Sequence, residues 1–401
     1  MSKRTCDIGY KGTIYYKGEL KEATLVANGE RLEVHGPTFP CECNTCLEMK
    51  GTVAFPGMVD AHVHLRGLML SYKEDPYTGS RAALRGGVVA VADMPNTLPK
   101  VNNIDVLQLK LKEFKEKCLV DCYMYAGVPS DINTARALSR YVIGFKVYPE
   151  DYERVDVLKW YDGLIVVHPE DPSYVKESPE PGERAFTRSP HAEPKAMERF
   201  RSFKKVHFTH VSTPEGALKA IEMGKSFDVT PHHLLLNNET EKRLGCIAKV
   251  NPPLRDEVRR SSLFEIFLER DVPLVTDHAP HAIWEKELSF YECPPGFPGL
   301  ETALPLLITL FKRGVITLEK VVKSYSELPA RLLGLEGYGK LEDGAFASYT
   351  IVDLNSRWRV EPWAFETKAK YSPFEGMELW GEVIGTVVKG KLRYFAGEFY
   401  R

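Results

Sequence analysis

The sequence predicts an α/β protein: a TIM-like (β/α)8 barrel carrying a small β-sandwich-like domain formed by both chain ends. Eight short β-branched apolar runs recur between residues 58 and 277, and most precede a helical pattern. Near-continuous apolar strands that alternate with helices indicate a parallel sheet buried on both faces. Alternating stretches at both chain ends predict the small domain. We place the small domain at residues 1–55 and 338–401, and the barrel at residues 56–337.

The chain ends contain patterns typical of antiparallel strands. Residues 12–16 and 22–27 alternate, with a turn signal at Asn28-Gly29. The same pattern returns at residues 348–353 and 382–390. We therefore expect the two ends to share one sheet-rich unit around the central barrel.

The barrel elements follow in order. Strands are predicted at residues 58–64, 88–94, 120–127, 142–148, 163–168, 206–211, 226–230 and 272–277. Helices are predicted at residues 104–117, 133–140, 155–161, 192–203, 214–223, 257–270 and 301–313. A doubly wound open sheet is the alternative. It has less support because no glycine-rich phosphate loop follows any of these strands.

The composition is typical of a soluble globular protein. The 401 residues carry a formal net charge of -2, with 43% hydrophobic and 27% charged residues. This charge predicts no nucleic-acid or membrane partner. No apolar run approaches the length of a membrane span, and the N-terminus lacks the apolar core of a signal peptide. We expect a cytoplasmic protein. The mixed charges of residues 110–117 predict a solvated helix face.

Eight cysteines are present, and disulfides are not expected in the cytoplasm. Cys41, Cys43 and Cys46 form a cluster, for which we favour free thiols in a loop. A zinc knuckle or a local disulfide is the alternative, although no fourth ligand lies nearby. The other cysteines are expected to be structural.

The first barrel strand ends in two histidines, His62 and His64. Residues i and i+2 of a strand share a face, so Asp60 and both imidazoles point the same way. Two imidazoles on one face form a bidentate grip for a metal such as zinc. The alternative is a pair of satisfied core histidines.

Other barrel strands also end in polar residues, where the active site of such a barrel forms. Lys146 lies in an apolar strand, so its ammonium must be paired with a carboxylate or neutralised. His168 ends the next strand, and His210 is favoured over His207 to face the barrel. Asp277 suits a metal or proton transfer. His232 and His233 are expected to lie on opposite sides of a strand, outside the inner ligand set.

Several motifs resemble the amidohydrolase superfamily and, within it, the dihydroorotase family. They are His64-Leu-Arg66, Asp93-Met-Pro-Asn96-Thr97, Pro231-His-His-Leu, Asn251-Pro-Pro-Leu, Asp277-His-Ala-Pro-His281, residues 294–302 and residues 372–376. The resemblance covers residues 56 to about 335. Gly67, Pro169-Glu170 and residues 148–152 depart from the family pattern.

The resemblance implies a role for each matching residue. His62, His64 and Asp277 would hold one zinc ion, and His168 and His210 a second. Lys146, carboxylated by carbon dioxide, would bridge the two ions. Arg66, Asn96, Asn251 and His281 would contact the substrate. An arginine fork suits a substrate carboxylate.

The implied reaction is the reversible cyclisation of N-carbamoyl-L-aspartate to L-dihydroorotate in pyrimidine synthesis. Asp277 would act as general base and then as general acid. An allantoinase, a dihydropyrimidinase-like enzyme and a non-catalytic scaffold are the alternatives. Arg66 and Asn96 disfavour the first two, and the full ligand set disfavours the scaffold. A homodimer and a complex with aspartate transcarbamoylase are further expectations.

Overall fold

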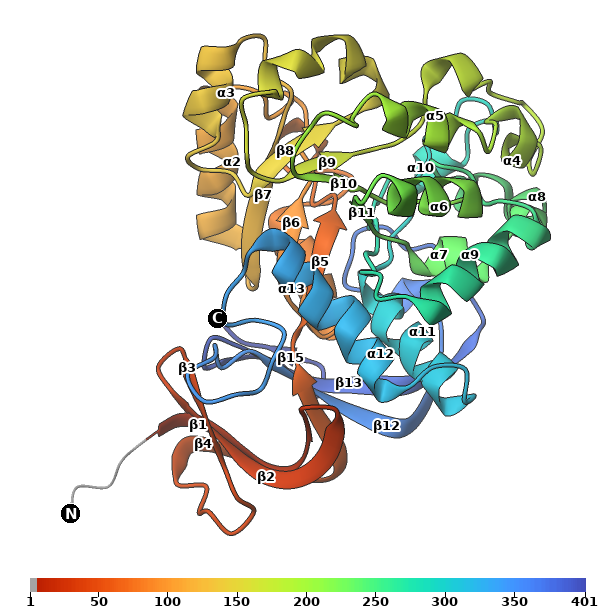
Figure 1. Cartoon of the computed structure of the whole chain (residues 1–401). Helices are drawn as coiled ribbons and strands as arrows, with labels where there is room; N and C mark the ends of the chain where they lie inside the picture. Colours follow the sequence, from red (N-terminus) through yellow and green to blue (C-terminus); the bar gives the residue numbers. More distant parts are fainter. Residues whose placement is uncertain (1–5) are drawn as a thin grey trace.

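The computed structural model describes residues 6–401, so most of the N-terminal stretch that lacks the apolar core of a signal peptide lies outside the described residues. At its centre is a curled parallel sheet whose strands follow one another in chain order (Figure 1). The strands are β5 Met58–Val63, β6 Val88–Asp93, β7 Asp121–Gly127, β8 Gly144–Val147, β9 Ile165–Val167, β10 Val206–Phe208 and β11 Ser226–Phe227. Seven of the eight predicted barrel strands are therefore regular strands.

The eighth predicted strand, residues 272–277, forms only single bridges instead of a regular ladder. Leu274 pairs with Val229 beyond β11, and His278 pairs with Val63 of β5, both in parallel orientation. The segment thus lies between the last and first strands and closes the barrel. The buried Asp60 carboxylate supports this closure, because it accepts hydrogen bonds from the Thr276 amide at 3.2 Å and the Tyr325 hydroxyl at 3.0 Å. Burial raises the pKa of Asp60 to about 7.

The helices pack outside the parallel sheet and begin at capping side chains. Asn103, Asp131, Thr213 and Asp256 each accept a hydrogen bond from a backbone amide of the following first turn. The α-helices are α1 Pro76–Arg85, α2 Ile104–Lys117, α3 Ile132–Leu138, α4 Arg184–Thr187, α5 Ala192–Glu198, α6 Pro214–Glu222, α7 Pro231–Leu235, α8 Asn238–Leu244, α9 Glu257–Glu269, α10 Ile283–Lys286, α11 Leu300–Lys312, α12 Leu318–Val322 and α13 Leu328–Leu333.

Shorter helical turns connect these elements. The 3-10 segments are η1 Leu68–Leu70, η2 Pro149–Leu158, η3 Pro172–Tyr174, η4 Gly245–Ile247 and η6 Pro362–Ala364, and a π-helical turn, η5, spans Lys323–Glu327. The α-helix expected at residues 155–161 is wrong, since η2 occupies most of that stretch. This 3-10 segment places Tyr148, just before its start, beside the end of β8.

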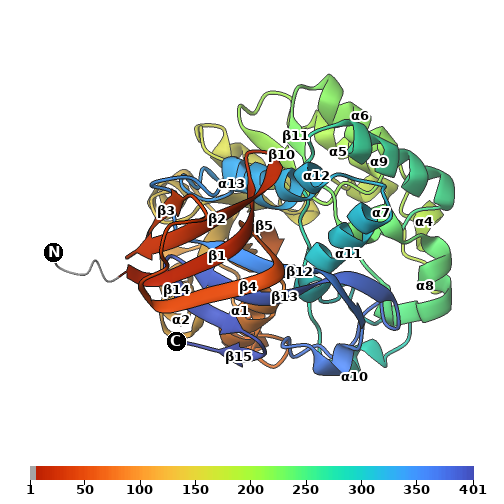
Figure 2. The same ribbon diagram turned by 90° about the horizontal axis from the view of Figure 1, so that it is seen from below.

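Strands from both chain ends form a second sheet of eight strands, in the order β15-β14-β13-β12-β4-β1-β2-β3. They are β1 Cys6–Tyr16, β2 Glu19–Asn28, β3 Arg31–His35, β4 Cys43–Pro56, β12 Tyr349–Arg359, β13 Glu378–Val388, β14 Lys391–Phe395 and β15 Glu398–Phe399. All neighbours are antiparallel except β1 and β4. In the view from below, this sheet lies in front of the barrel (Figure 2).

The two sheets are joined by a very short connection. β4 ends at Pro56 and β5 begins at Met58. On the other side β4 pairs with β12, where Ala54 is opposite Ile351, so the N- and C-terminal segments meet there. The fold class predicted from the sequence is confirmed. The division at residues 55/56 and 337/338 stays a prediction.

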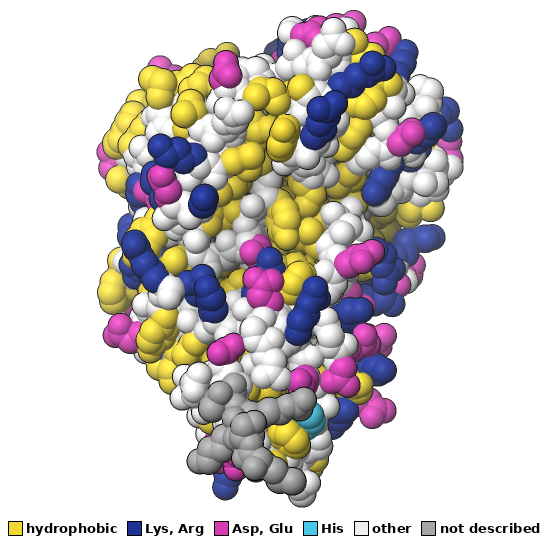
Figure 3. Space-filling model, turned by 90° about the vertical axis from the view of Figure 1, so that its left-hand side faces the viewer, with side chains coloured by type: hydrophobic (Ala, Val, Ile, Leu, Met, Phe, Trp, Pro, Cys, Tyr) yellow, Lys and Arg dark blue, Asp and Glu magenta, His cyan; other side chains and the backbone are white. Residues whose placement is uncertain are grey.

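The surface carries mixed charges. Basic and acidic side chains are scattered over the face shown in Figure 3, and neither sign gathers into a large patch on its described part. Within residues 6–401, no helix combines the length and the apolar content needed to cross a membrane.

The cysteine prediction is wrong, because all eight cysteines are paired. The disulfides are Cys6–Cys43, Cys41–Cys46, Cys118–Cys122 and Cys246–Cys293. The parallel register of β1 and β4 sets Cys6 opposite Cys43, with 4.4 Å between their Cα atoms. Strand pairing could not be read from residue spacing, so this partner was missed.

The solvated face expected for residues 110–117 is also only partly correct. Lys110 of α2 is fully buried, and its Nζ lies 3.2 Å from Asp93 Oδ2 and donates to the Arg66 carbonyl at 2.6 Å. This lysine points inward and supports the loop after β5. The alternating charges of this helix therefore include one lysine, Lys110, that is buried and structural.

We predict that the protein shows no reactive thiol when it is denatured without reductant. All eight half-cystines should react with a thiol reagent only after reduction. Breaking Cys246–Cys293 alone, with serine at both positions, should lower the free energy of unfolding by about 4 kcal/mol for a loop of 47 residues. Thiol titration and calorimetry measure the two effects. Free thiols in unreduced protein would contradict the pairing.

Candidate functional site

A cavity of about 450 Å³ opens at the carboxyl ends of the barrel strands. All predicted site residues except Lys146 line it: His62, His64, Arg66, Asn96, His168, His210, Asn251, Asp277 and His281. They come from loops and strand ends far apart in the chain, as expected for the active face of such a barrel.

The tightest group in the cavity consists of His62, His64 and Asp277. The Nε2 atoms of His62 and His64 lie 3.3 Å and 3.0 Å from Asp277 Oδ1. One ligand atom from each residue falls within 4.8 Å of the others, and all three side chains are buried. Burial lowers the pKa of both histidines, so each imidazole is neutral. This group could hold a metal ion.

Partners on the far ring nitrogens orient both imidazoles. His62 Nδ1 donates to Thr209 Oγ1 at 2.6 Å, and Thr209 in turn donates to Asp228. His64 Nδ1 donates to Asn96 Oδ1 at 2.8 Å. Both Nε2 atoms are therefore left with a lone pair directed at the centre of the group. Such outer hydrogen bonds are typical of histidines that bind metal.

His168 and His210 lie next to this group. Their ring centroids are 4.6 Å apart, and His210 is 5.0 Å from His62. His168 Nε2 donates to Glu170 Oε2 at 2.7 Å, which leaves Nδ1 as its free acceptor. The Nδ1 of His210 is buried and has no hydrogen-bond partner among the described residues. These two atoms are available to a second cation.

Three cavity residues have an uncommon backbone conformation. Arg66, His210 and Asp277 have φ values of 52°, 42° and 49°, although none is glycine. Left-handed conformations of this kind require support from surrounding contacts and concentrate at functional sites. At Arg66 the support comes from Lys110, which binds its carbonyl, and at His210 from Asp228, which accepts from its amide.

Lys146 lies beneath the histidines in β8. Its side chain is 0% exposed, and its Nζ has no hydrogen-bond partner or carboxylate within 4 Å among residues 6–401. The salt bridge considered from the sequence is therefore absent there. Burial lowers the pKa of Lys146 to about 7, and burial is also the main cause that lowers the pKa values of His62 and His210 well below their usual range. A buried lysine without a counter-ion has a neutral amine that can react.

Arg66 and His281 form the opposite side of the cavity. Arg66 Nη2 is 3.2 Å from His281 Nε2, and Arg66 Nε donates to the Pro280 carbonyl at 3.2 Å. Neither residue contacts a carboxylate with its cavity-facing nitrogens. His281 Nε2 also lies 3.0 Å from the Pro295 carbonyl, so the N–H groups of Arg66 are the donors that this side offers to an anion.

Asn96 and Asn251 each have one amide end already engaged. Asn96 Oδ1 accepts from His64, and Asn251 Oδ1 accepts from Arg184, a buried residue that also binds Glu241 and the Val250 carbonyl. The amide nitrogens of both asparagines remain available as donors in the cavity. Both predicted contact residues are thus fixed by the protein in one orientation.

Sequence reasoning missed the residues that orient these ligands. Glu170 binds both His168 and Arg188, whose Nη2 lies 2.6 Å from Glu170 Oε2. Burial acts to raise the pKa of Glu170, but Arg188 and His168 outweigh it and hold that pKa well below its usual range. The only signal was the position of Glu170 two residues after His168. Tyr148 also lines the cavity.

His232 and His233 do not lie on opposite sides of a strand as expected. Pro231 begins the short helix α7, and the two rings lie side by side with centroids 4.5 Å apart. His233 Nε2 donates to the Pro252 carbonyl at 3.0 Å. Neither residue lines the cavity, so they are packing residues next to it.

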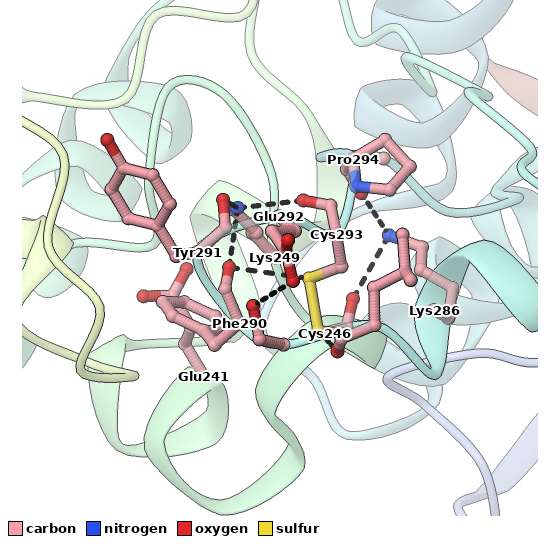
Figure 4. The surroundings of a disulfide bond; sticks show 12 residues. Glu241, Cys246, Lys249, Lys286, Phe290, Tyr291, Glu292, Cys293 and Pro294 are labelled. Carbon is pink, nitrogen blue, oxygen red and sulfur yellow. Dashed lines mark hydrogen bonds between the residues drawn. A yellow bond between two sulfur atoms is a disulfide. The ribbon is translucent and has the colours of Figure 1, made fainter.

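One wall of the cavity is held by a disulfide and two buried lysines (Figure 4). Cys246–Cys293 joins the segment before Asn251 to the loop that reaches Gly296. Lys249 Nζ donates to the Phe290 and Cys293 carbonyls, both at 2.7 Å. A third bond, between the Gly296 amide and the Lys249 carbonyl at 2.8 Å, ties the two segments directly at the cavity.

Lys286 supplies the second lysine of this wall. Its Nζ donates to the Cys246 carbonyl at 3.0 Å and to the Pro294 carbonyl at 2.7 Å. Burial lowers the pKa of Lys286 well below its usual range and that of Lys249 to about 8. Both lysines therefore serve as multiple donors to backbone carbonyls in place of a carboxylate partner.

Comparison with known proteins agrees with this geometry. Residues 51–137 match the family described as dihydro-orotase-like, and residues 203–393 match the amidohydrolase family. The sequence is 34% identical to the dihydroorotase of Saccharolobus solfataricus over 88% of this chain and 86% of that protein. It is 37% identical to the dihydroorotase of Aeropyrum pernix over 96% of this chain and 94% of that protein.

The fold also matches solved structures. The L-hydantoinase (dihydropyrimidinase) from Arthrobacter aurescens superposes with a TM-score of 0.90 and 24% identity over 99% of this chain and 98% of that one. At this identity the likeness concerns the fold alone. The resemblance drawn from the strand-end motifs is confirmed by the sequence relatives. The chain therefore belongs to the dihydroorotase family of the amidohydrolases, which are metal-dependent enzymes that hydrolyse cyclic amides.

Proposed function

We propose that this protein is a zinc-dependent dihydroorotase, which interconverts N-carbamoyl-L-aspartate and L-dihydroorotate in de novo pyrimidine synthesis. One observation carries the proposal. Within a single cavity, the metal-compatible group His62, His64 and Asp277 lies together with Arg66 and His281, and no carboxylate contacts the cavity-facing nitrogens of this pair. A cyclic amide bearing a carboxylate matches both halves of such a cavity.

The residues present fit two metal ions. His62, His64 and Asp277 would hold the first ion, and His168 and His210 the second. Lys146, carboxylated on Nζ, would bridge them: the neutral amine attacks carbon dioxide, a C–N bond forms, and one proton leaves. Its support is the buried Nζ without a partner, together with the unpartnered His210 Nδ1. When bound, the ions would lower the pKa of a water and polarise the amide carbonyl.

The chain's own groups would bind the substrate and move the proton. Asp277 faces the ligand histidines with Oδ1, and in the hydrolytic direction it would accept a proton from the attacking water and deliver it to the ring nitrogen. Arg66, His281 and the amide nitrogens of Asn96 and Asn251 would bind the carboxylate and the ring. Such positioning converts a bimolecular step into an intramolecular one.

Assays with dihydroorotate, allantoin and dihydrouracil test this assignment. We expect turnover of dihydroorotate, with little activity on the other two, because neither carries a ring carboxylate for Arg66. Metal analysis of protein purified without chelator should find about two zinc ions per chain. Turnover of allantoin or dihydrouracil but not dihydroorotate would overturn the proposal, and a metal-free protein without activity would favour the scaffold.

Arg66→Lys should weaken substrate binding more than folding. Lysine keeps the positive charge but lacks the planar fork, so the Michaelis constant for dihydroorotate should rise about tenfold, the value of one lost charge-assisted hydrogen bond. Thermal unfolding should change little. Steady-state kinetics and calorimetry measure both effects, and an unchanged Michaelis constant would contradict this role.

The assembly is part of the same proposal. A homodimer and a complex with aspartate transcarbamoylase, located in the cytoplasm, are what the family resemblance suggests. Light scattering of the purified protein, alone and mixed with that enzyme, tests both.

A further inference from the structure

Behind His281, outside the cavity, lies an ion pair that no motif singled out. Lys73 follows η1 and Glu285 belongs to α10, and their Nζ and Oε1 atoms are 2.7 Å apart. The same Lys73 Nζ lies 3.0 Å from His281 Nδ1. Neither Lys73 nor Glu285 lines the cavity, so the pair reaches the substrate side only through the imidazole.

The contacts of His281 determine which ring nitrogen carries the proton. Burial, with Arg66, Lys286 and Lys73 nearby, lowers the pKa of His281 to about 3, so the ring is neutral. A proton on Nε2 satisfies two contacts: Nδ1 accepts from Lys73, and Nε2 donates to the Pro295 carbonyl at 3.0 Å. A proton on Nδ1 would face the Lys73 ammonium and satisfy only the contact with Arg66.

We propose that Lys73 is a positioning residue that holds His281 in the tautomer with its N–H on Nε2, the ring nitrogen on the cavity side, where the carboxylate of a bound substrate would meet it. Its Nζ occupies the Nδ1 lone pair from behind. The Nε2–H is then held at the Pro295 carbonyl, which lines the cavity, and Nε2 lies 3.2 Å from Arg66 Nη2. A substrate carboxylate bound by Arg66 would share this N–H with the Pro295 carbonyl or replace that carbonyl as its acceptor. This inference rests on the proposed function, because it assigns the carboxylate as the group that His281 recognises.

Glu285 holds Lys73 and would replace it if the lysine were removed. Its Oε1 also accepts from the Tyr72 hydroxyl at 3.3 Å, and its Oε2 accepts from the Ala282 amide at 2.9 Å. Oε2 lies 3.7 Å from His281 Nδ1. Without the lysine, this carboxylate becomes the nearest charged group to Nδ1 and attracts a proton there.

Nitrogen NMR of the ligand-free enzyme tests the tautomer directly. The His281 signals can be assigned by their loss in His281→Asn. In the wild type we expect a protonated Nε2 and an unprotonated Nδ1. In Lys73→Met, Nδ1 should become protonated beside Glu285, whereas Lys73→Arg should keep the wild-type pattern because it still donates to Nδ1.

Kinetics supply the second readout. Lys73→Met should raise the Michaelis constant for dihydroorotate about tenfold with a smaller change in kcat, and Lys73→Arg should restore most of it. Lys368→Met is the matched control, because Lys368 pairs with Asp75 and does not contact His281. An unchanged His281 tautomer or an unchanged Michaelis constant in Lys73→Met would overturn the inference. If the wild type failed to turn over dihydroorotate, the proposed function would fall, while the spectra would still decide the tautomer.

Discussion

Lys146→Met is expected to abolish turnover without weakening the fold. Methionine cannot be carboxylated, so the proposed bridge between the metal ions is lost, and kcat should fall roughly a thousandfold or more. Metal content should drop from about two ions per chain to about one or none. The metal-free protein should unfold at the same temperature as the wild type or higher, because a buried amine without a hydrogen-bond partner is removed. Kinetics, metal analysis and calorimetry measure the three quantities.

Lys110→Met provides the matched comparison. Lys110 is as deeply buried as Lys146, but it is paired with Asp93. Its removal leaves that carboxylate buried without its counter-ion, and the free energy of unfolding should fall by about 3–5 kcal/mol. A Lys146→Met protein as unstable as Lys110→Met would show that Lys146 has a structural counter-ion, and near-normal activity would exclude the carbamate.

Asp277→Asn is expected to keep part of the metal and lose almost all activity. The amide oxygen can still face His62 and His64, but asparagine cannot accept and return a proton. General acid–base catalysis contributes about 10²–10⁴-fold, so kcat should fall by about that factor.

The control for this variant is Asp156→Asn, an exposed aspartate that is paired with Lys159 and does not line the cavity. It should be indistinguishable from the wild type. Near-normal kcat in Asp277→Asn, with metal retained, would contradict the proton-transfer role.

Many residues of the site could be predicted from the sequence because the geometry of a strand is simple. Side chains of a strand alternate with a period of two residues, which puts His62 and His64 on one side at the end of β5. The barrel topology brings the carboxyl ends of all the other strands to the same face. Lys146 was recognisable because a lysine is out of place in an apolar strand. Such patterns are local, so the polar residues at the strand ends could be predicted from the sequence. Asn251 followed only from the family resemblance, and Arg188, which also lines the cavity, was not predicted.

What could not be predicted depends on contacts between distant segments. Cys6 meets Cys43 only through the parallel register of β1 and β4. The partnership of Glu170 with Arg188 requires a loop to fold back over 18 residues. Lys73 next to His281 depends on two loops whose paths have no periodic signal. The type and spacing of side chains do not reveal these contacts between distant segments.

The way the barrel closes has a consequence for local opening of its backbone. Three contacts join β5 to the closing segment at residues 272–278. They are the Asp60 carboxylate with the Thr276 amide, the bridge between Val63 and His278, and the hydrogen bond from the His64 amide to the His278 carbonyl at 2.8 Å. This junction has fewer backbone pairs than any junction between two regular strands of the barrel. Among the strand junctions of the barrel, amide hydrogen exchange should therefore be fastest at this one. A metal ion bound by His64 on one side of the junction and by Asp277 on the other would stabilise it and slow that exchange.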